Sequence, residues 1–264
     1  MEWPSLLLGT IVLRPYVFVF LAVYLTIAIL NMGLVRSIVF TLLAYTIAFL
    51  SEYSSTRIGF PYGFYEYIET TRGQELWISN VPFMDSLSYS FLAYVAYTMA
   101  LFMWSPLKIN RWDIRLVESA RVRRSLRVVF SGAIFFMLMD VIIDPIAFQG
   151  DRWFLGQIYT YKEQGEYFNI PLTNFFGWLL VGTCILYSFT RWDRYLDQIF
   201  PYKEQEFPAQ ALLGPALYFG VLLFNLAVTF YIGEWALGAC GTSLTLMLFW
   251  LLYQKIRRPK KFSL

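Results

Sequence analysis

The chemistry in this sequence centres on carboxyl side chains that fall inside apolar segments. Asp140 and Asp144 are four residues apart in one apolar run, so a helix would place both on one face. Glu52 follows the apolar run 41–50 without a break. Ionisable groups inside a membrane span are costly and usually mark function. Because like charges repel and low polarity disfavours ionisation, we expect the aspartate pair to share a proton near neutral pH, as a general acid requires.

Some acidic residues have a second, structural interpretation. Asp85 falls in the first turn of a predicted helix, where a carboxylate suits the helix dipole, so it is either a capping charge or part of a site. Glu234 lies in a short predicted turn and is expected to be solvated. The pair Asp140 and Asp144 is alternatively a structural hydrogen-bonded pair or a set of magnesium ligands.

Two loops rich in glycine, proline and aromatic residues, 58–67 and 149–174, flank these carboxyl groups. Aromatic faces stabilise a desolvated cation by up to ~2 kcal/mol, which makes Tyr65, Tyr67 and Trp153 candidates for contact with a cationic intermediate. Asn174 falls in the outer third of a predicted helix and can hydrogen-bond a carboxyl group or hold a water molecule. An interfacial belt of Trp and Tyr is the alternative interpretation of the aromatic residues.

Histidine is absent from the chain. Histidine-ligated di-iron, haem, zinc and copper sites are therefore not expected, and we predict no cofactor and no metal. If the protein adds oxygen to a lipid, we expect water rather than O2 to be its source. Cys184 and Cys240 sit in apolar runs and are interpreted as small buried hydrophobic residues.

The elements that must position these residues are membrane spans. The chain has 264 residues, of which 58% are hydrophobic and 15% charged, whereas a soluble domain carries roughly a quarter charged residues. We predict an all-α, polytopic transmembrane bundle that forms a single domain, 1–264. Pro82 and Pro171 suit first helical turns, and Pro145 is expected to end or kink the fourth helix. The seven predicted spans are 16–33, 35–55, 81–104, 128–148, 171–190, 211–231 and 235–254.

The distribution of Lys and Arg predicts the orientation. With the N-terminus outside and the C-terminus in the cytoplasm, sixteen basic residues fall on the inner side and five on the outer side. The inner set comprises Arg36, seven residues of the loop 105–127, Arg191, Arg194, Lys203 and five residues from Lys255 onward. We interpret the basic loop as a topology determinant that touches anionic lipid, not as a nucleic-acid site. The first residues carry no signal-peptide pattern, so we expect a multi-pass protein of the cell (cytoplasmic) membrane that keeps its first helix.

One pattern of residues resembles a known family. The sequence is similar to the membrane carotenoid 1,2-hydratases, a group of carotenoid biosynthesis proteins that includes bisanhydrobacterioruberin hydratase and γ-carotene 1′-hydratase. The resemblance covers roughly residues 16–255. Asp85 departs from the family pattern, in which an apolar residue is expected. The resemblance rests on Ser51-Glu52, Gly59-Phe60-Pro61-Tyr62-Gly63, Tyr65-x-Tyr67, Asp140-x-x-x-Asp144-Pro145, Trp153, Gly165-x-Tyr167-Phe168-x-Ile170-Pro171-Leu172-x-Asn174-Phe175 and Gly177-Trp178.

The resemblance implies addition of water across the terminal C1–C2 double bond of an acyclic carotenoid end (lycopene, γ-carotene or bisanhydrobacterioruberin type), without a redox cofactor. The expected catalytic residues are Asp140 and Asp144 as the acid and Glu52 as the base. Substrate contacts are expected from six residues: Tyr65, Tyr67, Trp153, Asn174, Phe60 and Trp178. Expected partners are the carotenoid substrate, the membrane lipid and other enzymes of the carotenoid pathway.

Two alternative functions stay open. Asp-x-x-x-Asp can hold magnesium and a diphosphate, as in an aspartate-rich membrane prenyltransferase, although only one such pair is present. A non-catalytic carotenoid-binding scaffold is the second alternative. A retinal protein is not favoured, because the predicted spans contain no lysine, and a transporter is not favoured, because no internal repeat is visible.

Overall fold

The computed structural model describes residues 3–111, 113–117, 119–202 and 206–258. Its seven long apolar helices confirm the all-α, polytopic prediction. Helix boundaries agree with the predicted ones to within three residues, except that the fifth span continues nine residues further, to Ile199. The spans are α2 (Pro15–Met32), α3 (Leu34–Ile58), α4 (Phe83–Trp104), α6 (Leu126–Phe148), α7 (Leu172–Ile199), α8 (Leu213–Tyr231) and α9 (Trp235–Arg257).

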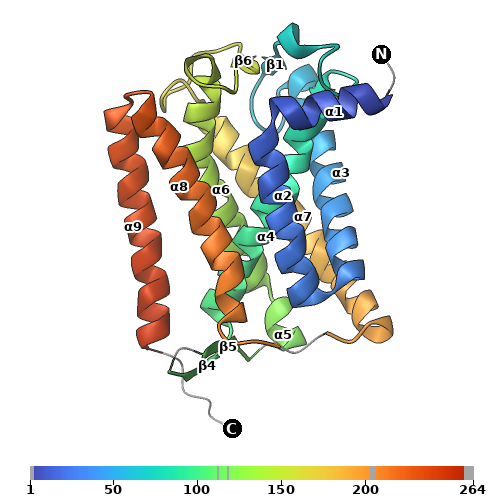
Figure 1. Cartoon of the computed structure of the whole chain (residues 1–264), viewed down its shortest axis with the longest axis vertical. Coiled ribbons are helices and arrows are strands. Elements are labelled where there is room, and N and C mark those ends of the chain that lie inside the picture. The colour runs from blue at the N-terminus through green and yellow to red at the C-terminus, as the bar shows by residue number, and fades with distance from the viewer. Residues whose placement is uncertain (1–2, 112, 118, 203–205, 259–264) are drawn as a thin grey trace.

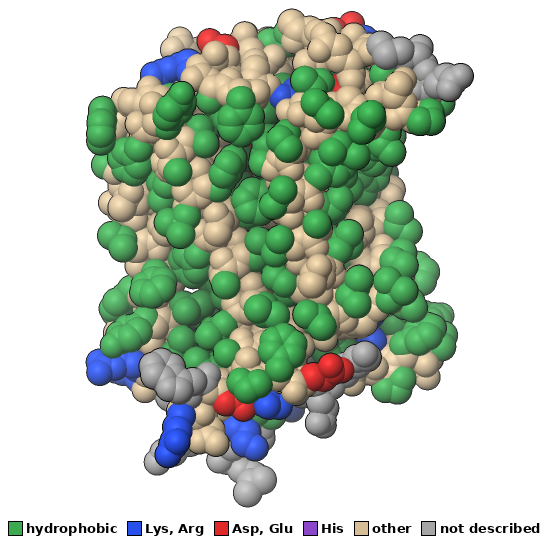
Figure 2. Space-filling view, viewed as in Figure 1, with side chains coloured by type: hydrophobic (Ala, Val, Ile, Leu, Met, Phe, Trp, Pro, Cys, Tyr) green, Lys and Arg blue, Asp and Glu red, His purple; other side chains and the backbone are tan. Residues whose placement is uncertain are grey.

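The helices form one bundle with charged residues at its two ends. The N-terminus lies at one end and the C-terminus at the other (Figure 1). Hydrophobic side chains cover the middle of the face in Figure 2, and Lys, Arg, Asp and Glu gather at the ends. This arrangement suits a bilayer, whose core excludes charge. The end that holds the N-terminus is called the outer end below, after the predicted orientation. Lys203, Lys260 and Lys261 of the predicted inner set lie outside the described residues.

Helix α4 is the central helix of the bundle. Within its apolar window, 89% of residues are buried, compared with 28% for α2 and 28% for α3. Neighbouring helices therefore surround α4, while α2 and α3 present much of their surface to lipid. The prediction that the two cysteines are buried is wrong. Cys184 and Cys240 are both exposed, because they lie on bundle faces that lipid rather than protein covers.

Pro145 does not end its helix, contrary to one of the two predicted outcomes. It lies inside α6, which continues to Phe148. A proline removes one backbone N–H donor, and so close to the helix end this costs only one hydrogen bond. The Gln149 side chain donates a hydrogen bond of 3.2 Å to the Pro145 carbonyl, one of the last backbone carbonyls of α6. Asp140 and Asp144 consequently stay on one continuous helix.

The outer end carries elements that the hydropathy pattern did not predict. Helix α1 (Trp3–Leu13) lies across this end (Figure 1). Strands β1 (Tyr65–Tyr67) and β6 (Tyr159–Tyr161) pair antiparallel, with Tyr65 opposite Tyr161 and Tyr67 opposite Tyr159. The 3-10 turns η1 (Glu69–Thr71) and η2 (Gly150–Arg152) and the strands β2 (Trp77–Ile78) and β3 (Val81–Pro82) complete this layer.

The inner end is built from the basic loop. Strands β4 (Leu107–Asn110) and β5 (Asp113–Leu116) form a hairpin, and the short helix α5 (Ala120–Arg123) follows. The 3-10 turn η3 (Gln210–Leu212) precedes α8. Arg36 is buried and donates to Asp193 over 2.9 Å and to Asp197 over 2.8 Å, and Arg123 and Arg124 contact the same two carboxylates. This network joins α3, α5 and α7.

Candidate functional site

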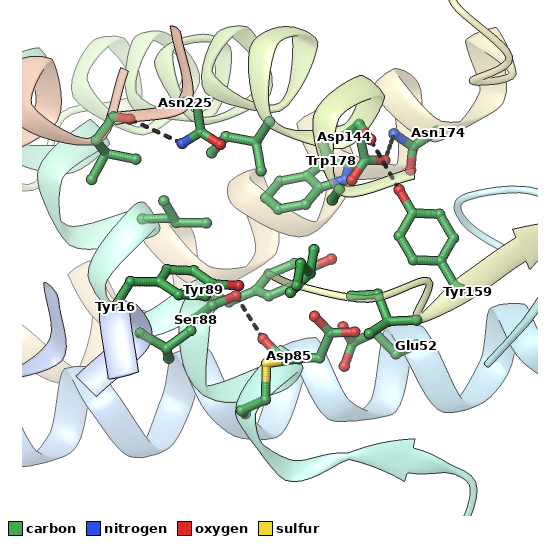
Figure 3. Close-up of a pocket in the computed structure, with 18 of the residues that line it drawn as sticks. Tyr16, Glu52, Asp85, Ser88, Tyr89, Asp144, Tyr159, Asn174, Trp178 and Asn225 are labelled. Carbon is green, nitrogen blue, oxygen red and sulfur yellow. Dashed lines mark hydrogen bonds between the residues drawn. The ribbon is translucent and has the colours of Figure 1, made fainter. Parts of the chain in front are cut away.

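A pocket of about 120 Å³ lies near the outer end of the bundle. Side chains of α2, α3, α4, α6, α7 and α8 line it together with both outer loops. Figure 3 shows carboxyl, amide and phenol groups pointing into this space between aromatic rings. Of the predicted site residues, the pocket lining includes Glu52, Asp144, Tyr65, Tyr67, Trp153, Asn174 and Trp178.

The first group of carboxyls comes from α6. Asn174 Nδ2, on the first turn of α7, donates to Asp144 Oδ2 over 2.6 Å and to Asp140 Oδ2 over 2.8 Å. Asp144 lines the pocket, whereas Asp140 is completely buried behind it. Asp140 Oδ1 has no hydrogen-bond partner among the described residues. One amide therefore holds two buried carboxyl groups together, and only one of them faces the pocket.

The second group lies on α3 and α4. Glu52 is buried six residues before the end of α3, where Gly59 caps the helix in the left-handed conformation. Tyr67 Oη donates to Glu52 Oε1 over 3.2 Å, and Ser86 Oγ donates to Glu52 Oε2. Asp85, next to Ser86 in the first turn of α4, also lines the pocket. Asp85 is thus both a first-turn carboxylate and a group of the site, so the two predicted roles are compatible.

The paired strands β1 and β6 contribute four tyrosines to the site. Tyr65, Tyr67, Tyr159 and Tyr161 all line the pocket, and their rings pack edge to face at 5.4–5.9 Å. Burial raises the pKa of each phenol well above its usual value. The four phenols therefore stay neutral, and their hydroxyl groups remain able to donate hydrogen bonds.

These phenols contact both Asp144 and Glu52. Tyr161 Oη contacts Asp144 Oδ2 at 3.5 Å, and Tyr65 Oη lies 3.5 Å from Tyr67 Oη, which donates to Glu52. Tyr159 Oη donates to the Asp144 backbone carbonyl over 3.2 Å. The sheet thus lies against both α6 and α3 and sets the position of one carboxyl group relative to the other.

Trp178 and Trp153 occupy different walls of the pocket. Trp178 stacks on Tyr89 at 4.5 Å with an angle of 13° between the rings. Gly177, beside it, lets the turn at Pro61 and Tyr62 approach α7, since a Cβ there would lie 2.5 Å from the Tyr62 ring. Trp153 Nε1 donates to the Ile146 carbonyl over 3.0 Å, which anchors its ring.

The structure does not bring Phe60 to the pocket. Its side chain is 60% exposed, and the pocket lining does not include it. Tyr62, two residues later, lines the pocket and shares a hydrogen bond of 2.9 Å with Ser51. The turn that follows Gly59 directs Phe60 outward and Tyr62 inward. The remaining expected aromatic contacts do face the cavity.

Two charged residues of the outer end form ion pairs. Glu234, expected to be a solvated turn residue, is partly exposed and pairs with Arg152. Arg14, which the sequence marks only as an outer basic residue, is buried and pairs with Glu75 at 3.2 Å. Arg14 also donates to the Leu155 carbonyl. It therefore ties the start of α2 to the segment between α3 and α4 and to the loop between α6 and α7, beside the pocket.

Several pocket residues were not predicted, and one signal could have found two of them. Tyr159-Thr-Tyr161 repeats the alternation of Tyr65-Glu-Tyr67, which in extended chains places both tyrosines on one face. Tyr16, Tyr89 and Asn225 carry no such signal, because they lie on apolar helices whose rotation the sequence does not fix. Within the described residues, no group of three or more His, Cys, Asp or Glu side chains could hold a metal ion.

Comparison with known proteins gives one match. A family model described as "Carotenoid biosynthesis protein" matches residues 5–248. No curated protein and no solved structure matches the chain. The matched range includes every pocket residue described above.

Proposed function

Because the chain belongs to the carotenoid biosynthesis protein family, we propose that it hydrates the terminal C1–C2 double bond of an acyclic carotenoid end group. Lycopene, γ-carotene and bisanhydrobacterioruberin carry ends of this type. The observation that supports the proposal is the pairing of Asp144 and Glu52 in one aromatic pocket, each held by its own hydrogen-bond partners. The reaction needs an acid, a base and a water molecule, and no redox cofactor.

The first step is protonation. The carboxyl pair Asp140 and Asp144 holds one proton, because two adjacent carboxylates that share one amide donor would repel each other in a buried site. Asp144, the member that faces the pocket, gives this proton to C2. The C1–C2 π electrons form the new C–H bond, which leaves a tertiary carbocation at C1. The neutral rings of Tyr65, Tyr67 and Tyr161 face this charge and lower its cost.

The second step is attack by water. The water oxygen forms a bond to C1, and Glu52, as the carboxylate, takes one of its protons, which leaves a tertiary alcohol. Asp85 lies beside Ser86, the hydrogen-bond partner of Glu52, and helps to hold this water. One proton leaves Asp144 and one arrives at Glu52, so the sum of the two steps is the addition of H2O. Before the next turnover the proton on Glu52 returns to the α6 pair. Tyr67, which donates to Glu52, and Tyr161, which contacts Asp144, are the hydroxyls at the two ends of that transfer.

We further propose that the protein acts in the cell (cytoplasmic) membrane on substrate dissolved in the bilayer, next to other enzymes of the carotenoid pathway. Seven apolar helices support the membrane setting.

Expression in a bacterial host that accumulates lycopene tests the proposal. The expected result is a product heavier by one or two water molecules, with label incorporated from H2(18)O. Asp144→Asn and Glu52→Gln are expected to lower product formation about a hundredfold or more, the typical contribution of a positioned acid or base. Glu163→Gln is the matched control, because Glu163 is exposed in an outer loop.

Four outcomes would contradict the proposal. Unchanged lycopene, with γ-carotene and bisanhydrobacterioruberin also unreacted, would remove the hydratase assignment. Activity that EDTA abolishes and magnesium restores would favour a prenyltransferase. Normal hydration by both carboxyl variants would show that other groups carry the reaction, whereas a pathway effect without any hydration would favour a scaffold.

A further inference from the structure

A second hollow lies on the lipid-facing side of α8, next to the pocket. It is lined by 151–154 of the outer loop and by Phe224, Ala227, Val228 and Tyr231 of α8, and we call it the α8 groove. Two of its residues, Trp153 and Phe224, also line the carboxyl pocket. The groove and the pocket therefore adjoin each other at these two side chains.

The shared wall is aromatic. Tyr16 of α2 stacks on Phe224 at 5.4 Å with an angle of 19° between the rings, and it lies 6.1 Å from Trp153. Phe154 packs on Trp153 at 4.9 Å. Trp153 is anchored by its hydrogen bond to the Ile146 carbonyl, whereas Phe224 is held by ring and aliphatic packing without a hydrogen bond. Rotation of the Phe224 ring would open the wall without breaking a hydrogen bond.

The position of this wall suits access from the bilayer. The outer loops cover the pocket on the aqueous side, where Arg14 joins α2 to Glu75 and to the Leu155 carbonyl. A long hydrocarbon dissolved in the bilayer cannot reach the carboxyl groups from that side without crossing water. The α8 groove instead combines exposed apolar groups, such as Phe154 (60% exposed), with a polar rim where Arg152 pairs with Glu234. This change from apolar to charged side chains along the groove matches the border between lipid tails and head groups.

We propose that the α8 groove binds the polyene chain of the substrate and that its end group passes between Trp153 and Phe224 into the pocket. This inference rests on the proposed function, because it takes a carotenoid as the occupant. The continuity of groove and pocket through two shared residues supports it. The groove is the lateral access route from the bilayer to Asp144 and Glu52.

Ala227→Trp tests the route, because it fills the groove without changing the pocket lining. Ala239→Trp is the matched control, because Ala239 is also exposed and lines neither the groove nor the pocket. Ala239 lies four residues from the outer end of α9, and Ala227 lies four residues from the outer end of α8. Both proteins are assayed with lycopene and with myrcene, a short terpene that carries the same end group. We expect Ala227→Trp to lower kcat/KM for lycopene about tenfold relative to the control and to leave kcat/KM for myrcene within about twofold.

Pigment retention separates this inference from the proposed function. The lycopene that copurifies with each variant is measured by absorbance per mole of protein. Lower lycopene retention in Ala227→Trp than in Ala239→Trp supports the groove, whether or not the wild-type protein hydrates either compound. Absence of hydration by the wild-type protein would overturn only the hydratase assignment. Equal lycopene turnover and retention in the two variants, equal losses on lycopene and myrcene, or no pigment on the wild-type protein would overturn the groove assignment.

Discussion

Asp144 and Glu52 reach the same cavity from different helices, and each has a companion carboxyl group. Asp140 stands behind Asp144, and Asp85 lies near Glu52 (Figure 3 labels all of these except Asp140). The two groups differ in their hydrogen-bond partners. The Asn174 amide donates to both members of the α6 pair, and Tyr161 adds a longer phenol contact to Asp144 at 3.5 Å, whereas Glu52 accepts only from phenol and serine hydroxyls among the described residues. Different surroundings are what allow two carboxyl groups to serve as acid and base in one pocket.

Asp85→Asn tests whether the fourth carboxyl takes part. If Asp85 holds the attacking water, the amide variant should lose about tenfold in kcat with little change in KM, since a well-placed group acts mainly on the transition state. As a first-turn carboxylate alone, Asp85 would contribute only ~0.3–1 kcal/mol to stability and nothing to turnover. Hydration rates and thermal midpoints in detergent are both measured. Glu66→Gln is the control, because Glu66 is exposed on the opposite face of β1 from the tyrosines. Unchanged kcat with a lowered midpoint would leave Asp85 a purely structural role.

At the scale of elements, two small structures hold the ends of the spans in place. The β1–β6 sheet joins the loop after α3 to the loop before α7 and brings four tyrosines over the pocket. The Arg–Asp network joins α3, α5 and α7 at the other end. Asp193 and Asp197 each contact all three arginines, and Asp193 is the more buried of the two, with a side chain 2% exposed against 26% for Asp197.

Asp193→Asn should therefore destabilise the bundle strongly. The substitution leaves the buried Arg36 without one of its two anionic partners, and breaking a buried ion pair costs about 3–5 kcal/mol. The measurement is the free energy of unfolding in mixed micelles, followed by tryptophan fluorescence. Asp113→Asn is the control: its pair with Arg115 at 2.9 Å is about one-third exposed, and such pairs contribute about 0–1 kcal/mol. Similar losses for the two variants would mean that the network is no more important than a surface pair.

The spans could be predicted from sequence because hydropathy and length respond to the bilayer alone. The nine additional residues of α7 could not, because Arg191, Asp193 and Arg194 interrupt the apolar pattern. The partners of Asp193 come from α3 and from the α5 region, far away in the sequence, and only the folded chain brings them together. Helix α1 was missed for a related reason, since its 11 residues are too few to span the bilayer.

Residues of the candidate site could be predicted where a charge interrupts an apolar run, as at Glu52 and Asp144, which line the pocket, and at Asp140 behind it. It was not predictable where the residue type is common in such runs. Tyr16 and Tyr89 resemble any interfacial or core aromatic residue until the rotation of α2 and α4 is known. The sequence also does not predict which aspartate faces the cavity, because the i,i+4 spacing places both on one helix face. The structure places Asp144 at the cavity and Asp140 behind it.

For the whole molecule, the two ends have different chemistry. The pocket lies near the end that carries the N-terminus, α1 and the β1–β6 sheet, whereas the basic hairpin and the Arg–Asp network lie at the end that carries the C-terminus. An odd number of spans places the termini on opposite sides of a membrane. Under the proposed function, the orientation decides on which side of the membrane the carotenoid end would be hydrated.

The bias of sixteen to five in Lys and Arg predicts that the pocket faces away from the cytoplasm. The test uses a background with Cys184→Ser and Cys240→Ser, because both native thiols are exposed. Single cysteines are then introduced as Glu163→Cys in the outer loop and Arg111→Cys in the basic hairpin turn. A membrane-impermeant maleimide should label the first in intact cells and the second only after the membrane is permeabilised. Both residues lie outside the spans, so the labelling pattern reports orientation rather than burial. The reverse pattern would place the carboxyl pocket at the cytoplasmic surface, and the hydrated end of the carotenoid would then lie in the inner leaflet.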